Sequence, residues 1–423
     1  MKWTTVLWAA LPLMVAATGS MVQAQGVGYS PGRALDAQSW TTFVRAVTPA
    51  GGGQLSFETW KTDAETYPTP PSAGLVAVRQ LSRFQASVLG RFHLPAGLTA
   101  ARQGLRSELP VPCEPAQPNP DMQPPPTPPP AASFPTPATA TPPFGCVAEE
   151  VRRDPLSYNH IVSNHLNTQP GLIKAFKLAP AGSPATAIPP FPNNAIELKA
   201  DWIPFTTIIQ WLKNNNVTVT RDDVMKNYYH VNEQGTDYAL VAVHISLKTR
   251  EHPNWVWATF EHQWNPGRCD TMGCYDQYGI VPSDAAIPPA SQQNTQYPVC
   301  TKSPALAAEM QKAQVSPVWN NYCLKETEVD FVSTQASTKG KPILDGNSVT
   351  ERIAAGVSIS SSSCIACHAN ASYTVVGTGS SARAAMNKAI GDAPIGAVTV
   401  LSPYMTYDFV WAIAAAYNAG PPE

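Results

Sequence analysis

The clearest structural pattern in this chain of 423 residues is the segment Tyr238-Ala-Leu-Val-Ala-Val-His-Ile-Ser-Leu247. Its side chains alternate between two sides, and aliphatic β-branched residues are frequent on one of them. Alternation with a period of two is typical of a β-strand, and β-branched side chains pack well on a pleated surface. The segment therefore predicts a strand in the body of the protein.

Neighbouring segments repeat this pattern. Residues 195–203 alternate in the same way, and residues 254–264 continue in the same style with several aromatic side chains. Together the three segments predict an antiparallel sheet. Nearer the N-terminus, residues 39–47 have apolar side chains at helical spacing and predict a helix, whereas residues 55–60 alternate and predict a strand.

A second pattern stands closer to the C-terminus, where Cys364-Ile-Ala-Cys-His368 has the C-x-x-C-H spacing of covalent c-type haem attachment. Two thiols three positions apart can add to the two vinyl groups of one porphyrin, and the adjacent imidazole then binds the iron. A zinc site or a redox dithiol would need a second ligand pair or a βαβ unit nearby. We therefore expect one covalent haem c on Cys364 and Cys367, with His368 as the proximal iron ligand.

Helices are expected on both sides of this motif. Asn347 or Ser348 can cap a helix over residues 347–357, and residues 408–417 form a second helical pattern. A small cytochrome c packs two such helices over its haem. The predicted fold class is α+β, with a β-rich antiparallel large domain followed by a small all-α haem domain like that of cytochrome c.

The second axial ligand decides whether the iron transfers electrons or binds a substrate. Met405 lies just ahead of the predicted C-terminal helix, which is where small cytochromes c carry their distal methionine, so it is the first candidate. Met386, on a helix predicted over residues 381–390, is an alternative. His262 or His244 of the large domain is another, and an open coordination position is the last.

Several segments together resemble those of a group of uncharacterised bacterial proteins known as cytochrome c family proteins. In chain order they are Trp40 with Phe43, Glu58-Thr59-Trp60-Lys61, His244 with Lys248 and Thr249, residues 255–262, Asn347, residues 363–368 and Asp408-Phe409-Val410-Trp411. The resemblance covers most of the chain. It implies a secreted or periplasmic protein with a single haem.

The first 24 residues have the features of a secretory signal peptide. Lys2 supplies a short positive region, residues 3–17 are apolar, and Val22-Gln23-Ala24 is a small-residue cleavage pattern. The apolar run is too short to cross a bilayer comfortably. We expect cleavage before Gln25, a periplasmic or secreted location, and no integral membrane segment after cleavage. Bacteria attach c-type haem in this compartment.

Six of the eight cysteines remain once the haem motif is assigned, and an oxidising compartment favours disulfides among them. Cys113 and Cys146 bracket a proline-rich segment, so we predict that they pair. The other four are then expected to pair among themselves: Cys269, Cys274, Cys300 and Cys323. A four-cysteine metal centre is the alternative, although these spacings resemble no zinc ribbon.

The predicted organisation has a signal peptide (1–24), an N-terminal part of the large domain (25–109), a proline-rich loop bracketed by a disulfide (110–146), a β-rich large domain (147–339) and a haem domain (340–423). Many of the 43 prolines lie in the loop, where they favour an exposed polyproline II conformation.

Two further patterns are weaker. Glu261 and His262, with His244 and His252, carry groups suited to acid–base or metal chemistry. Neighbours on a strand point to opposite faces, so Glu261 and His262 should not share a pocket. Residues 375–382 imitate a G-x-G-x-x-A motif, but a dinucleotide site would require a βαβ unit.

The net charge of −2 argues against nucleic acid as a partner. We predict a periplasmic cytochrome with one haem c that transfers single electrons between redox partner proteins. One alternative is an oxidoreductase whose large domain oxidises a small-molecule substrate and passes the electrons to the haem. The other is a sensor in which the haem reports redox state or a gas. The sequence assigns no catalytic residue.

Overall fold

The computed structural model describes residues 35–67, 148–178, 188–214, 217–233, 235–265, 302–330, 345, 347, 364–369, 371–376, 381–384 and 405–418. Several predicted features lie outside these residues, so they stay predictions. They are the signal peptide, the proline-rich loop, most of the helix expected over 347–357, Met386, and the cysteines at positions 113, 146, 269, 274 and 300.

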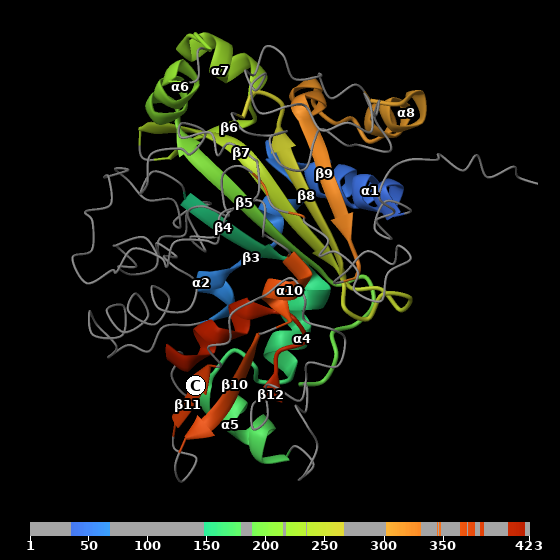
Figure 1. Cartoon of the computed structure of the whole chain (residues 1–423), viewed down its shortest axis with the longest axis vertical. Coiled ribbons are helices and arrows are strands. Elements are labelled where there is room, and N and C mark those ends of the chain that lie inside the picture. Colours follow the sequence, from blue (N-terminus) through green and yellow to red (C-terminus); the bar gives the residue numbers. More distant parts are fainter. Residues whose placement is uncertain are drawn as a thin grey trace, which may run out of the picture.

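A sheet of seven antiparallel strands forms the body of the molecule (Figure 1). Its order is β3-β4-β5-β7-β8-β9, and β6 also pairs with β7. The strands are β3 (Lys61–Thr62), β4 (Ala148–Arg153), β5 (Ile196–Pro204), β6 (His230–Glu233), β7 (Thr236–Leu247), β8 (Val256–His262) and β9 (Tyr322–Glu328). The three strands predicted from alternation are confirmed as β5, β7 and β8.

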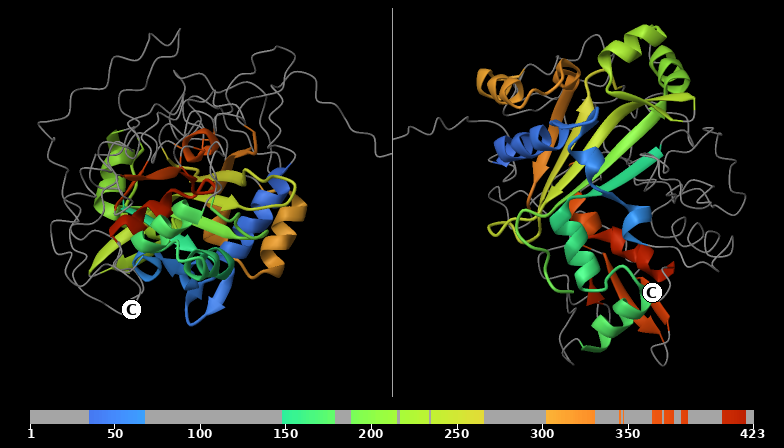
Figure 2. Two further views of the ribbon diagram at one scale, coloured as in Figure 1. Left: turned by 90° about the horizontal axis from the view of Figure 1, so that it is seen from below. Right: turned by 180° about the vertical axis from the view of Figure 1, so that it is seen from behind.

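One face of the sheet is apolar and is covered by α1 (Asp36–Val47), with α8 (Pro304–Lys312) packed beside it (Figure 2). Phe43 of α1 stacks on Phe260 of β8 with the ring centroids 4.3 Å apart, and Trp40 meets the same ring edge-on at 4.9 Å. Aromatic pairs in these geometries stabilise a core beyond the area they bury. The helix predicted over residues 39–47 is confirmed.

The opposite face of the sheet carries polar and charged side chains. Lys199, His244 and Thr259 lie side by side in one cross-strand row on β5, β7 and β8. The next row along includes Asp201 and Glu261, both of which are fully buried. Because Asp201 and Glu261 are buried, this face forms a polar layer inside the protein and is not a solvated surface. Buried polar groups of this kind need hydrogen-bonding partners.

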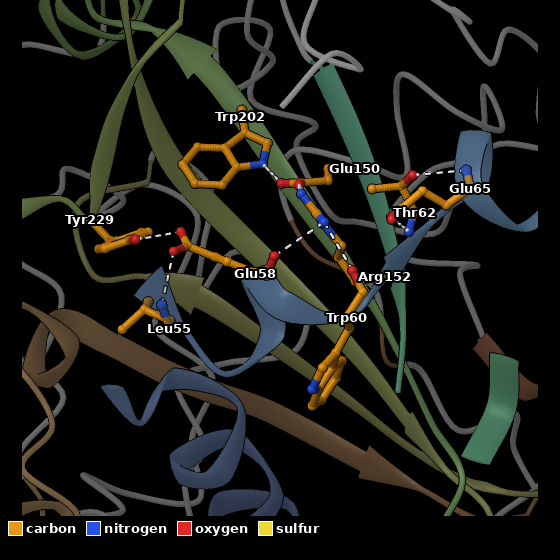
Figure 3. Close-up of polar contacts among 9 residues, drawn as sticks. All are labelled: Leu55, Glu58, Trp60, Thr62, Glu65, Glu150, Arg152, Trp202 and Tyr229. Carbon is orange, nitrogen blue, oxygen red and sulfur yellow. Dashed lines mark hydrogen bonds and ion pairs between the residues drawn. The ribbon is translucent and has the colours of Figure 1, made fainter. Parts of the chain in front are cut away.

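A buried ion pair ties the N-terminal segment to the sheet (Figure 3). Arg152 on β4 donates from Nε to Glu150 at 2.7 Å and from Nη1 to the carbonyl of Trp60 at 3.0 Å. The second carboxylate oxygen of Glu150 accepts from Trp202 Nε1 at 2.9 Å. Both charges are therefore paired and hydrogen-bonded, which is the condition under which buried charges are tolerated.

The N-terminal segment corrects one prediction. β1 (Pro49–Gly51) and β2 (Gln54–Leu55) form a two-stranded hairpin, after which η2 (Phe57–Thr59) begins, so the strand predicted over residues 55–60 is wrong beyond Leu55. The cause is Glu58, whose Oε2 accepts from the backbone N–H of Leu55 at 2.9 Å. A side chain that bonds the local backbone in this way favours a turn over an extended strand.

The described C-terminal residues contain α10 (Cys364–His368), η7 (Trp411–Asn418) and a three-stranded antiparallel sheet in the order β11-β10-β12. The strands are β10 (Ser372–Val376), β11 (Ser381–Ala384) and β12 (Met405–Thr406). For these residues the predicted all-α haem domain is wrong, while the α+β class is confirmed. The sequence Tyr-Thr-Val-Val in β10 has high strand propensity, which explains the difference.

Two helices predicted from the sequence also differ in the structure. The helix expected over residues 408–417 is a 3-10 helix that begins only at Trp411, after a turn at Asp408 and Phe409. The helix expected over residues 381–390 begins instead as strand β11, which pairs antiparallel with β10. Because residues 381–384 are a strand that pairs with β10, they do not begin the helix that a dinucleotide site requires.

The C-terminal sheet packs against α4 (Pro155–Ser163) and α5 (Gln169–Leu178), below the large sheet in the view of Figure 1. Tyr373 and Ile413 share a buried cluster with Leu172 and with Trp255 and Trp257 of the large sheet. Among the described residues, the segment after 340 therefore has a core in common with earlier parts of the chain.

The remaining described elements are α2 (Asp63–Thr66), α6 (Phe205–Asn214), α7 (Arg221–Asn227) and η5 (Pro317–Asn321). Of these, α6 and α7 pack at the end of the large sheet farthest from α10 (Figure 1). No helix in the described ranges is both long and apolar enough to cross a membrane.

Candidate haem site

The motif helix α10 is fastened to the polar face of the large sheet. Its backbone N–H at Ile365 donates to Glu328 of β9 at 3.1 Å. The Sγ atom of Cys364 lies 3.4 Å from the carbonyl of Asp345 and 4.0 Å from the hydroxyl of Thr259 on β8. The side chain of Cys364 is half-buried. Cys367 lies on the same short helix.

His368 has one ring nitrogen engaged and one without a partner. Nδ1 lies 2.7 Å from the carbonyl oxygen of Phe409. Burial lowers the pKa of His368 to about 4, against a smaller opposing effect of that hydrogen bond, so the imidazole is neutral at pH 7. A carbonyl only accepts, so Nδ1 must carry the proton and Nε2 the lone pair. Nε2 has no hydrogen-bond partner in the described part of the chain.

These residues fit a c-type haem. A metal-binding histidine ordinarily donates its other ring N–H to a carbonyl or carboxylate, and Phe409 supplies that acceptor. The thiol of Cys364 lies four residues away on the same helix. Cys364, Cys367 and His368 are thus the residues that would hold the group, as the motif predicts.

The aromatic ring of Trp257 covers one side of His368. The two ring centroids are 4.3 Å apart, with an angle of 44° between the planes. Trp257 is itself fixed, since its Nε1 donates to the carbonyl of Asn254 at 2.8 Å. The imidazole is therefore held both through Nδ1 and through its ring.

Met405 has a different neighbour from the one expected. It is buried in β12, and its sulfur lies 3.2 Å from the hydroxyl of Tyr373. That hydroxyl also lies 2.8 Å from the carbonyl of Leu172. No contact joins Met405 to His368 among the described residues. The assignment of Met405 as second ligand stays a prediction, and the contacts of its sulfur are those of a core residue.

His262 is fully engaged elsewhere. Nε2 lies 3.0 Å from the carbonyl of Asn227, Nδ1 accepts from the backbone N–H of Trp264 at 3.1 Å, and the ring stacks on Tyr228. Neither ring nitrogen is left for a metal in this arrangement. Glu261 lies on the opposite face, 3.7 Å from Lys325, so the expectation that Glu261 and His262 do not share a pocket is confirmed.

His244 is brought next to the motif. Its Nδ1 lies 3.0 Å from the Thr259 hydroxyl, the same group that meets Cys364, and its Nε2 lies 2.7 Å from the side-chain nitrogen of Asn347. Burial lowers the pKa of His244 well below its usual value, and the nearby charge of Lys199 adds to this effect. A neutral imidazole in a polar layer therefore borders the motif.

Two metal-site candidates can be placed. The ligand atoms of Glu328, Asp345 and Cys364 lie within 4.8 Å of one another. This cluster shares its thiol with the haem motif, so we treat it as part of the motif's surroundings. Cys323 takes part in a disulfide, which removes it from the four-cysteine metal centre considered above. Its partner lies outside the described side chains, and no disulfide pair is seen among them.

The sequence did not point to Phe409, Lys248 or Asp408 as parts of this site. Lys248 and Asp408 form an ion pair at 2.7 Å, with side chains only 6% and 9% exposed, next to the turn that carries the Phe409 carbonyl. Lys248 lies just after the end of β7 and Asp408 lies in a turn, so no local sequence pattern indicates that the two form a pair. Trp257 did stand out as one of several large aromatic residues on its strand.

Comparisons with protein families, with curated proteins and with solved structures find no match to this chain. The functional conclusion therefore rests on the chemistry of the site.

Proposed function

We propose that this chain is a c-type cytochrome with one haem, bonded to Cys364 and Cys367 and ligated by His368. The state of His368 carries the proposal. Its imidazole is neutral, its Nδ1 donates to the Phe409 carbonyl, and its Nε2 has no partner in the described residues. Such an imidazole binds a metal without first losing a proton or breaking a hydrogen bond.

The proposed activity is the transfer of single electrons between redox partner proteins. When bound, the haem supplies a one-electron iron couple. The chain contributes a fixed proximal side, because Trp257 and Phe409 hold the imidazole and α10 is fastened to β9 through Glu328. A site that moves little is suited to electron transfer, because little rearrangement accompanies the change of charge.

The proposed location is the periplasm or the exterior of the cell. The support is the signal-peptide pattern in the first 24 residues and the C-x-x-C-H motif, because bacteria attach c-type haem after export. The similarity of several segments to cytochrome c family proteins belongs to the same proposal.

A second candidate function is that of a haem-containing oxidoreductase. The observation in its favour is the polar row of Lys199, His244 and Thr259 that borders the motif. Buried and half-buried groups able to donate and accept protons next to a redox centre are typical of sites that bind a small polar substrate.

Optical spectra of the purified ferric and ferrous protein separate the two functions. The electron-transfer proposal predicts low-spin spectra in both oxidation states and no change on addition of carbon monoxide. A high-spin ferrous spectrum that shifts with carbon monoxide would contradict it and favour the oxidoreductase. In that case candidate small substrates should reduce the haem with no other donor present.

A further inference from the structure

We propose that the segment from Lys248 to Trp257, at the junction of β7 and β8, positions His368, so that the large sheet forms the proximal wall of the haem site. This inference rests on the proposed haem. It assigns the large sheet a role in setting the redox potential, which the haem motif by itself does not give.

The first support is the ring of Trp257. It is almost fully buried, its Nε1 is held by the Asn254 carbonyl, and its centroid lies 4.3 Å from that of His368. A second ring, that of Phe409, lies 6.4 Å from Trp257. Rotation of the imidazole about its side-chain bonds would meet the indole ring. Trp257 therefore restricts the direction in which Nε2 points.

The second support is the way the Phe409 carbonyl is held. The neighbouring Asp408 receives Lys248 Nζ on both carboxylate oxygens at 2.7 and 2.9 Å, and its own carbonyl accepts from Trp255 Nε1 at 2.9 Å. Its Oδ2 also accepts from the backbone N–H of Phe191 at 2.8 Å. The turn that presents the acceptor for His368 is thus anchored mainly by the segment that carries Trp257.

The third support is backbone conformation. Trp255, Asp408 and Phe409 all have positive φ values, of 70°, 51° and 71°. Residues with side chains rarely adopt this region, and they do so where the surrounding structure holds them. Three such residues meet at the contact that orients His368.

The expected consequence is a lower potential. A strong hydrogen bond from Nδ1 to a carbonyl makes the imidazole a better donor to the metal, which favours the ferric state. If the segment is loosened, the hydrogen bond from His368 to Phe409 weakens, and the ferrous state becomes easier to reach. Trp257 and Lys248 are positioning residues in this account, since they act through His368.

The test measures the midpoint potential of the haem-loaded full chain and of variants. Trp257→Leu and Lys248→Met are expected to shift the equilibrium toward the ferrous form by roughly tenfold, which corresponds to about 59 mV for one electron. Trp257→Phe, which keeps a ring against His368, should restore most of the wild-type potential. Trp264→Leu is the matched control, because Trp264 packs in a different cluster, and its potential should not move.

Unchanged potentials in Trp257→Leu and Lys248→Met, with haem present and the chain folded, would overturn the inference. The same holds if Trp264→Leu shifts the potential equally, because the effect would then be a general loss of stability. If Trp257→Leu does not fold, Lys248→Met decides by the same criterion, with Trp264→Leu as its control. A wild-type chain without haem would instead contradict the proposed function.

Discussion

The surroundings of His368 hold its imidazole in a single protonation state and tautomer. Burial lowers its pKa from 6.5 to about 4, and the Phe409 carbonyl fixes which nitrogen carries the proton. The folded chain therefore disfavours the imidazolium form. Below pH 6.5 the imidazole takes up a proton in the unfolded chain but not in the folded chain. The free energy of unfolding therefore falls as the pH drops from 6.5 toward 4.

This gives a prediction for the haem-free protein, prepared with both motif cysteines replaced by serine. Its free energy of unfolding should fall by up to about 3 kcal/mol between pH 6.5 and pH 4 because of His368 alone. Urea titrations at several pH values measure the change. The same protein carrying His368→Gln is the control, and parallel pH profiles for the two would refute the prediction.

Met405 offers a second test at a single residue. Met405 is the first candidate for the second axial ligand that a low-spin haem needs, so Met405→Leu should make the haem spectrum high-spin. Its sulfur lies against the Tyr373 hydroxyl in a buried cluster, and because the swap conserves volume, the loss of stability should stay below about 1.5 kcal/mol. Absorbance spectra and urea unfolding measure the two effects. An unchanged spectrum would show that Met405 is a core residue and not the second axial ligand.

Among the elements, β4 shows why some strands escape sequence-based prediction. Its sequence Ala-Glu-Glu-Val-Arg-Arg has the charge content of a solvent-exposed segment, yet Glu150, Arg152 and Arg153 are buried. The same is true of β9, where Lys325 and Glu328 are buried. Arg153 pairs with Asp63 and Lys325 with Glu261, which are distant in the sequence, and such pairing leaves no mark on the local pattern.

The buried pair on β4 should matter far more than an exposed one. Glu150→Gln leaves Arg152 without its counter-charge inside the protein and should cost roughly 3–5 kcal/mol of stability. Lys61→Gln is the comparison, because it breaks the exposed pair with Glu65 (Figure 3 shows Glu65 at the edge of this region) and should cost at most about 0.5 kcal/mol. Urea unfolding measures both losses, and equal losses would show that burial does not set the value of these pairs.

The strands that were predicted correctly share one property. In β5, β7 and β8 the aliphatic residues of one side pack under α1, so burial enforces the alternation that the sequence displays. The helices over residues 381–390 and 408–417 were predicted from local sequence pattern alone. Pairing with β10 makes the first of these segments begin as a strand, and the turn at Asp408 and Phe409 delays the start of the second.

At the scale of the molecule, the motif and its surroundings differ in how far they can be predicted. Cys364, Cys367 and His368 are recognisable because their chemistry depends on spacing within five residues. Trp257 precedes His368 by more than 100 residues in the printed sequence, and only the folded sheet brings them together. On the proposed function, the residues that would bind the haem are local in sequence, whereas those that would tune it are distributed over the chain.

The two faces of the large sheet contact different parts of the chain. Its apolar face holds α1, while its polar face meets α10 and the backbone carbonyl of Asp345. The sheet therefore supports the motif directly and is not a separate appendage linked to it. On this account a truncated chain that begins near residue 340 would lack Trp257, Glu328 and Lys248, and with them the wall behind His368.

A covalent haem on the motif adds its mass to the chain, so intact-mass measurement is the decisive test of the proposed function. The chain should be expressed with an export signal in cells that possess the apparatus for attaching c-type haem. The mature protein should gain the mass of one haem after denaturation, whereas Cys364→Ser with Cys367→Ser should gain none. A wild-type chain that is folded, exported and free of haem would rule out the proposed haem site.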